Sequence, residues 1–139
     1  MEDTKLVIVI QCEVAKKRCS GIHCMQSFFN REHSFENYPS DKNIKFLTFN
    51  CGGCNGKSVN TFLNHVTKNL NRDKGIEKDN VVIHLASCIA FDNHHSDRCM
   101  FIDYTKSQIL KAGYKNIVEG SYLSKMASKK REEGIYKKY

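Results

Sequence analysis

The apolar run at residues 6–10 constrains the fold more than any other feature of the sequence. It has five consecutive apolar residues, four of them β-branched, so neither face of a strand built from it offers a polar side to water. A strand of this kind is typical of a parallel sheet whose two faces are covered by helices. Residues 44–50 and 81–85 have the same character, and we expect two further strands covered on both faces.

Helical patterns separate these strands. Apolar residues within 59–70 recur at offsets 0, 3, 4, 7 and 11, the spacing of one helix face. Residues 101–112 follow a similar pattern and end before Gly113, which suits the left-handed position after a helix. A shorter helix is predicted over 22–29. The alternation predicts a three-layer α/β/α fold, flavodoxin-like or Rossmann-like, with a parallel sheet of about four strands, the last near residues 115–120.

Length and charge narrow the class of protein. A chain of 139 residues with 40% apolar content is expected to form one domain with one core. The first apolar run is too short and wrongly flanked for a signal peptide or a membrane span, so we expect a soluble cytosolic protein with no membrane partner. The net charge is +7, but residues 121–139 hold six Lys or Arg against two Glu, which is +4 of it. Such a segment is more often solvated than bound to phosphate, so the charge does not predict a nucleic-acid partner.

Seven cysteines dominate the chemistry that the sequence offers. In a reducing compartment structural disulfides rarely persist, and an odd count argues against a closed set of them. Metal ligation or thiol chemistry is therefore the leading interpretation.

The cysteines follow the expected strands. Cys12 ends the first strand, Cys51 the second and Cys88 the third, so all three are expected at one edge of a parallel sheet. The other four lie in strand-to-helix connections or at helix starts: Cys19, Cys24, Cys54 and Cys99. A helix N-terminus lowers the pKa of a nearby thiol, and the thiolate is the species that binds metal. The expected inner set of ligands is the four cysteines nearest strand ends: Cys12, Cys51, Cys54 and Cys88.

The sharpest local motif is Cys51-Gly52-Gly53-Cys54. Two intervening residues let both sulfurs face one ion, and the glycines let the backbone approach it. The same pair at a helix start is also suited to thiol–disulfide exchange of the thioredoxin type, which is the alternative function. That alternative assigns a role to two cysteines and none to the other five. Because both functions stay open, the sequence does not decide whether the chain is an enzyme.

The expected cofactor is zinc or an iron–sulfur cluster, because both take thiolate ligands; a cluster would indicate a redox or sensing role. Histidines are weaker candidates. His94 and His95 lie in a polar loop that could supply nitrogen ligands, whereas His84 lies within a strand and is expected to be packed or hydrogen-bonded. His23 adjoins Cys24, but adjacent helix positions do not face the same way.

Two segments are similar to known phosphate-binding loops but differ from them in spacing or composition. Residues 52–58 are close to a P-loop, but only three residues separate Gly52 from Gly56 where four are needed. Cys12 and Arg18 have the spacing of a cysteine phosphatase loop, but the residues between them lack glycines and begin with Glu13, whose charge would repel the phosphate.

The residues around the cysteines resemble the CGGC domain family, which takes its name from the tetrapeptide at residues 51–54. The resemblance covers roughly residues 7–122, and all seven cysteines fall on cysteine positions of the family. Its matching segments are Cys12, Cys19-Ser20-Gly21, Cys24, Asn50-Cys51-Gly52-Gly53-Cys54-Asn55-Gly56-Lys57, Leu85-Ala86-Ser87-Cys88-Ile89, Cys99 and Glu119-Gly120. The resemblance implies a metal-binding domain over residues 1–122, to which residues 123–139 would add a basic helix or tail. Tyr122 stands where the family has a histidine.

Overall fold

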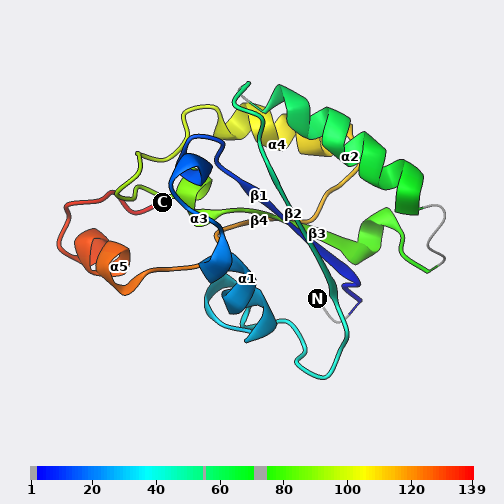
Figure 1. Cartoon of the computed structure of the whole chain (residues 1–139), viewed down its shortest axis with the longest axis horizontal. Coiled ribbons are helices and arrows are strands. Elements are labelled where there is room, and N and C mark those ends of the chain that lie inside the picture. The colour runs from blue at the N-terminus through cyan, green and yellow to red at the C-terminus, as the bar shows by residue number, and fades with distance from the viewer. Residues whose placement is uncertain (1–2, 55, 71–74) are drawn as a thin grey trace.

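The computed structural model of the chain describes residues 3–54, 56–70 and 75–139, so Asn55 of the glycine-rich loop lies outside the described residues. The fold is built on a four-stranded sheet in which all neighbouring strands are parallel (Figure 1). The strands are β1 (Leu6–Gln11), β2 (Lys45–Asn50), β3 (Val81–Leu85) and β4 (Ile117–Glu119), in the order β2-β1-β3-β4. This is the order of flavodoxin-like doubly wound sheets, and the predicted fold class is confirmed.

Helices cover both faces of the sheet. Helices α2 (Lys57–Leu70) and α4 (Ile102–Lys111) lie side by side over one face, and α1 (Ile22–Phe29) lies over the other (Figure 1). These three match the predicted helices, and Gly113 follows α4 with φ +95°. The other helical segments are α3 (Ser87–Ala90), α5 (Lys125–Glu132) and 3-10 turns at Ala15–Lys17, His33–Phe35 and Lys78–Asn80.

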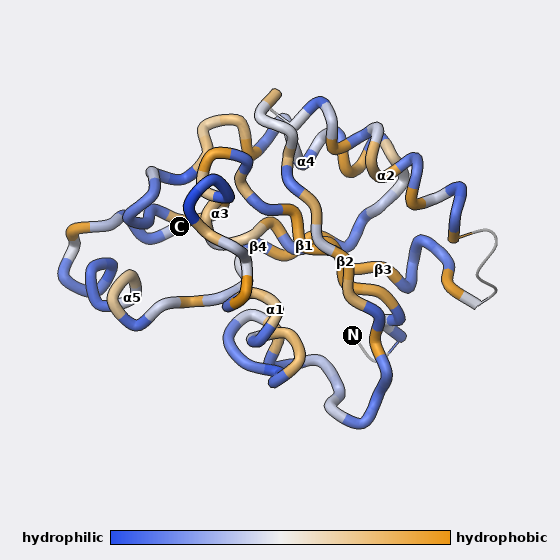
Figure 2. The backbone as a smooth tube through the Cα atoms, in the orientation of Figure 1, coloured by the Kyte–Doolittle hydropathy of each residue, from blue (hydrophilic) through white to orange (hydrophobic). Residues whose placement is uncertain are grey.

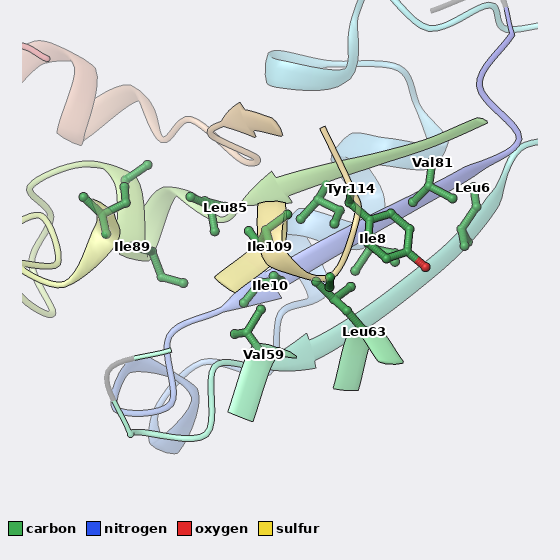
Figure 3. Packing of buried hydrophobic residues seen from close by; sticks show 14 residues of the cluster. Leu6, Ile8, Ile10, Val59, Leu63, Val81, Leu85, Ile89, Ile109 and Tyr114 are labelled. Atoms are coloured by element: carbon green, nitrogen blue, oxygen red, sulfur yellow. The ribbon is translucent and has the colours of Figure 1, made fainter. Parts of the chain in front are cut away.

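The side chains of β1 pack into two hydrophobic cores, because successive residues of a strand point to opposite faces of the sheet. Ile8 and Ile10 pack with Leu63 of α2 and Ile109 of α4 (Figure 3). Val7, one residue earlier, packs on the opposite face in the cluster that includes the rings of α1 and the following loop. All six residues of β1 are buried, as its continuous apolar run predicts.

The expectation that the second strand is covered on both faces is wrong. Lys45, Leu47 and Thr48 of β2 are exposed, because β2 is an edge strand with only β1 beside it. Figure 2 shows the contrast along the chain, with apolar residues concentrated in the central strands and hydrophilic residues along α5.

The strand order fixes where loops meet. The chain passes from β1 to β2 on one side of β1, whereas β3 and then β4 lie on its other side. The carboxyl ends of β1 and β3 therefore border the point where the strand order reverses, which is where open α/β sheets bind ligands. Helices α3 and α5 lie beyond these strand ends (Figure 1).

Candidate functional site

Cys12 and Cys88 meet at this switch point. Cys12 follows β1 directly, and its main-chain N–H donates a hydrogen bond to the sulfur of Cys88 at 3.2 Å. Cys88 does not end its strand as expected: β3 stops at Leu85, and α3 carries Cys88 three residues further. Burial is the main cause that raises the pKa of the Cys88 thiol to about 12, and the charges of Cys12, Cys24 and Cys19 contribute to the rise, whereas the hydrogen bond from the Cys12 N–H opposes it. Those three thiols therefore lie within electrostatic reach of Cys88.

A cavity of about 160 Å³ lies beside Cys88. Three of the predicted ligands line it, namely Cys19 from the β1–α1 loop, Cys24 from the first turn of α1, and Cys88. The Cys24 sulfur also lies 3.2 Å from the hydroxyl oxygen of Ser121, which follows β4. Segments that are far apart in sequence thus bring three thiols to one hollow.

Two serines hold the walls of this cavity together. The hydroxyl of Ser121 accepts a hydrogen bond from the Ser87 N–H at 3.0 Å, and the hydroxyl of Ser87 accepts one from the Ser121 N–H at 3.0 Å. Ser121 is fully buried. This reciprocal pair fixes the loop after β4 to the start of α3, and so fixes the wall next to Cys24 relative to the wall that carries Cys88.

Cys51 extends the ladder between β1 and β2. Its N–H donates to the carbonyl of Gln11 at 2.9 Å, directly after the last paired residues of the two strands. Cys51 is therefore near Cys12 at the sheet edge, as predicted. It does not line the cavity that Cys88 lines.

Cys54 lies at the start of α2, where its sulfur receives hydrogen bonds from one residue. The sulfur is 2.9 Å from the Ser58 hydroxyl and accepts from the Ser58 N–H at 3.1 Å. The Ser58 hydroxyl is the largest of the effects that lower the pKa of Cys54, followed by the Ser58 amide. Gly52 makes this approach possible, because a Cβ there would lie 2.7 Å from the Cβ of Ser58.

Cys99 precedes α4 and packs against the core on the α2 and α4 side of the sheet. Its N–H donates to the carbonyl of Ile89 at 2.9 Å. The structure thus divides the seven free cysteines into a group around Cys88, the pair of the glycine-rich loop, and Cys99.

Within residues 3–54, 56–70 and 75–139, no group of three or more His, Cys, Asp or Glu side chains is arranged to hold a metal ion. The cavity thiols are nevertheless donors of the right kind, because soft thiolates are ligands of zinc and of iron–sulfur clusters. Their sulfurs line one space without converging on one point. Coordination therefore requires the cysteine side chains to turn toward the ion.

His84 has the structural role that its place in a strand predicts. It is fully buried, and its Nδ1–H donates to the carbonyl of Gly120 at 2.8 Å, since a carbonyl can only accept. Its Nε2 then accepts from the Tyr38 hydroxyl at 2.6 Å. Burial lowers the pKa of His84 to about 4, so the ring is neutral at pH 7.

His23 and Cys24 are adjacent in the first turn of α1, and both line the cavity. His94 and His95 line the same cavity from the loop after α3. The ring of Tyr122 stacks on that of His23, with centroids 4.7 Å apart and planes at 20°.

Two of the other lining residues, Gln11 and Arg131, were not predicted at the site, whereas the basic Lys16 adjoins the first group of cysteines in the sequence. Gln11 ends β1, Lys16 lies in the first 3-10 turn, and Arg131 belongs to α5. Their common position follows only from the order of the strands and the path of the loops.

The fold and these thiols define a doubly wound α/β protein whose cysteines gather at the carboxyl ends of its central strands. The chain belongs to the CGGC domain family, whose model matches residues 6–122. This is a cysteine-rich family to which metal binding is ascribed, and the matched region holds all seven cysteines. No curated protein and no solved structure matches the chain. Among the described residues, no helix has the length and apolar character needed to cross a membrane.

Proposed function

We propose that the protein binds a metal, zinc or an iron–sulfur cluster, through the thiolates of Cys19, Cys24 and Cys88. The observation that carries this proposal is that these thiols come from three separate segments and line one cavity at the sheet's switch point. Cys12 adjoins the set through the hydrogen bond from its N–H to the Cys88 sulfur. A cluster would give the protein a redox or sensing role.

The electrostatics of Cys88 support a cation at this position. Burial and the neighbouring thiols disfavour negative charge on its sulfur, so the thiol is protonated in the protein alone. A bound divalent ion displaces the thiol proton, and it compensates the charge that burial penalises. The Cys12 N–H would then hydrogen-bond a metal-bound thiolate, which is how surrounding groups usually orient metal ligands.

The ligand set proposed here differs from the one that strand positions suggest. Cys19 and Cys24, rather than Cys51 and Cys54, share a cavity with Cys88. Ligation by Cys51, Cys54 and Cys99 stays a prediction, for a second site or for a centre with more than one metal.

The metal content of single cysteine variants tests the proposal. The protein would be purified without oxygen and without an affinity metal, and its zinc and iron would be measured per chain by elemental analysis. We expect Cys24→Ser and Cys88→Ser to lose the metal. Cys99→Ser makes the same chemical change outside the cavity, and it should keep the metal that the cavity thiols hold, even if a second site loses its own. Full metal content in the folded Cys24→Ser and Cys88→Ser proteins would overturn the proposed set.

Thiol–disulfide exchange by Cys51 and Cys54 is the second candidate, and the hydrogen bonds from Ser58 to the Cys54 sulfur favour it. In this reaction the two thiols give up two protons and two electrons to form one S–S bond, while a low-molecular-weight disulfide is cleaved to two thiols. Incubation of the reduced protein with oxidised glutathione should produce an intramolecular Cys51–Cys54 disulfide, detected by mass spectrometry after digestion. The idea fails if Cys54 gives only a stable mixed disulfide.

Residues 123–139 are proposed to belong to the same domain as residues 1–122. Asp92 supports this, because its carboxylate accepts hydrogen bonds from the Lys137 N–H at 3.2 Å and the Tyr139 hydroxyl at 3.0 Å. A reducing, cytosolic location is also part of the proposal and is supported by the seven free thiols. The proposal includes no membrane or nucleic-acid partner.

A further inference from the structure

The cavity beside Cys88 is large enough for a small molecule. Its volume of about 160 Å³ is close to that of an engineered protein cavity of about 150 Å³ that binds benzene. Part of its wall is apolar, formed by Ala15, Phe91 and Ala127 together with the cavity thiols. A buried thiol behaves as a small apolar group, so this part of the wall suits an apolar ligand body.

One polar side chain in the wall has no partner in the protein. Gln11 is only 3% exposed, and among the described residues its side-chain amide makes no hydrogen bond. No polar side-chain atom of the described chain is sealed from solvent without a partner, so the Gln11 amide must open into the cavity. Water can hydrogen-bond this accessible amide in the free protein, and an acceptor on a ligand in the cavity would replace that water.

Gly21 brings a cation next to this amide. It has φ +84°, and a Cβ at this position would lie 2.7 Å from Gln11 Nε2 and 2.8 Å from Lys16 Nζ. The missing side chain of Gly21 therefore leaves the space in which both nitrogen donors lie. Lys16 donates one proton to the Ser20 carbonyl at 2.7 Å, which leaves two of the three ammonium protons for another acceptor.

A second cation reaches the cavity from α5. Arg131 lies 5.2 Å above the ring of Phe91, and no carboxylate of the described residues forms an ion pair with it. The carboxylate in the wall is that of Asp92, which already accepts from the Arg98 N–H at 2.8 Å and the Tyr139 hydroxyl at 3.0 Å. The lining residues thus carry two cations, Lys16 and Arg131, against the single carboxylate of Asp92.

We infer that this cavity binds a small organic anion of about the size of benzene, held by Lys16, Arg131 and the Gln11 amide. The apolar body of the ligand packs against Phe91 and Ala127, and its anionic group takes the donors that the protein leaves unused. The inference goes beyond metal binding and concerns the metal-free protein, because the thiols that would hold the metal line the same cavity as these nitrogen donors.

Benzoate and its neutral isostere benzamide test the inference on the full chain in dithiothreitol, an uncharged reductant. Each would be titrated into the ¹⁵N-labelled protein and followed by amide NMR shifts. We expect benzoate to cause saturable shifts at Lys16, Gly21 and Ser121, and benzamide to bind at least about tenfold more weakly, since hydrogen bonds to a charged group are the stronger ones. The inference is overturned if benzoate gives no saturable shifts, if they lie elsewhere, or if benzamide binds equally well.

Matched variants distinguish an effect of the cavity cations on benzoate binding from a general effect of the substitution on folding. Lys16→Met and Arg131→Met should each weaken benzoate binding about tenfold. The controls Lys17→Met and Lys129→Met remove exposed cations from the same two segments and should leave it unchanged. Ala127→Leu would fill the cavity without removing a charge and should also weaken binding. Equal benzoate affinity in both cavity-cation variants and their controls would overturn the inference.

Discussion

The buried pair of His84 and Tyr38 gives the stability of this protein a defined pH dependence. His84 is fully buried and neutral, and its pKa falls from an ordinary 6.5 to about 4. Between these values the unfolded chain binds a proton at this ring and the folded chain does not. Stability therefore decreases as the pH falls from about 6.5 toward 4. Because one pKa unit corresponds to about 1.36 kcal/mol, the loss from this ring between pH 7 and pH 4 is about 3 kcal/mol.

That loss is a large part of a typical free energy of unfolding of about 5–15 kcal/mol, so urea unfolding at a series of pH values can resolve it. The comparison variant is His84→Gln, whose amide can still donate to the Gly120 carbonyl and accept from Tyr38 but does not titrate. The wild-type protein should lose about 3 kcal/mol more than His84→Gln between pH 7 and pH 4.

Two further results bear on this reasoning. His65→Gln changes an exposed histidine of α2 and should show the pH dependence of the wild-type protein. Amide and ring NMR should report a pKa below 5 for His84, in line with its value of about 4. If wild-type protein and His84→Gln lose equal stability with acid, the burial argument for His84 is refuted.

Three other changes have defined outcomes. Leu63→Ala leaves a cavity between α2 and the sheet and should lower the free energy of unfolding, measured by urea titration, by about 2–5 kcal/mol. Leu110→Ala, at a side chain that is 56% exposed, should lower it by less than about 1 kcal/mol. Equal losses would contradict the core described here. Ser58→Ala removes the hydroxyl next to the Cys54 sulfur and should raise the pKa of that thiol, so that iodoacetamide alkylation of Cys54 shifts to higher pH; an unchanged profile would count against the role of this hydrogen bond. Asp92→Asn keeps the size of the side chain but removes its charge, and it should speed amide hydrogen exchange in the last few residues of the chain; unaltered protection there would show that other contacts hold the terminus.

The sequence predicted the fold best at β1, the strand whose two faces pack against two hydrophobic cores. The continuous apolar run of β1 predicts burial on both faces, and all its residues are buried. The position of Gly113 after α4 was predictable because few residues adopt its φ of +95°. The prediction of burial on both faces was wrong for β2, whose apolar residues are interrupted by Lys45 and Thr48, both of which are exposed on this edge strand.

The site was predictable only in part, for a related reason. Parallel strands bring Cys12 and Cys88 to the same edge of the sheet. The two residues lie close together there because β1 and β3 are neighbouring strands. Which loop cysteines join them depends on the strand order and on the path of the loops. Local spacing drew attention to the cysteine pair of the glycine-rich loop, whereas the cavity is lined by Cys19 and Cys24. Gln11 and Arg131 were not predicted at the site, because a single amide in a sequence does not reveal what it faces and the basic segment that contains Arg131 was expected to be solvated.

The central claim is that thiolates of this chain hold a metal, and the most direct test is elemental analysis with a visible absorption spectrum on wild-type protein purified without oxygen and without an affinity metal. We expect either colourless protein with stoichiometric zinc or brown protein with iron and labile sulfide. Folded protein with all seven thiols reduced and no bound metal would contradict the claim and favour dithiol exchange at Cys51 and Cys54.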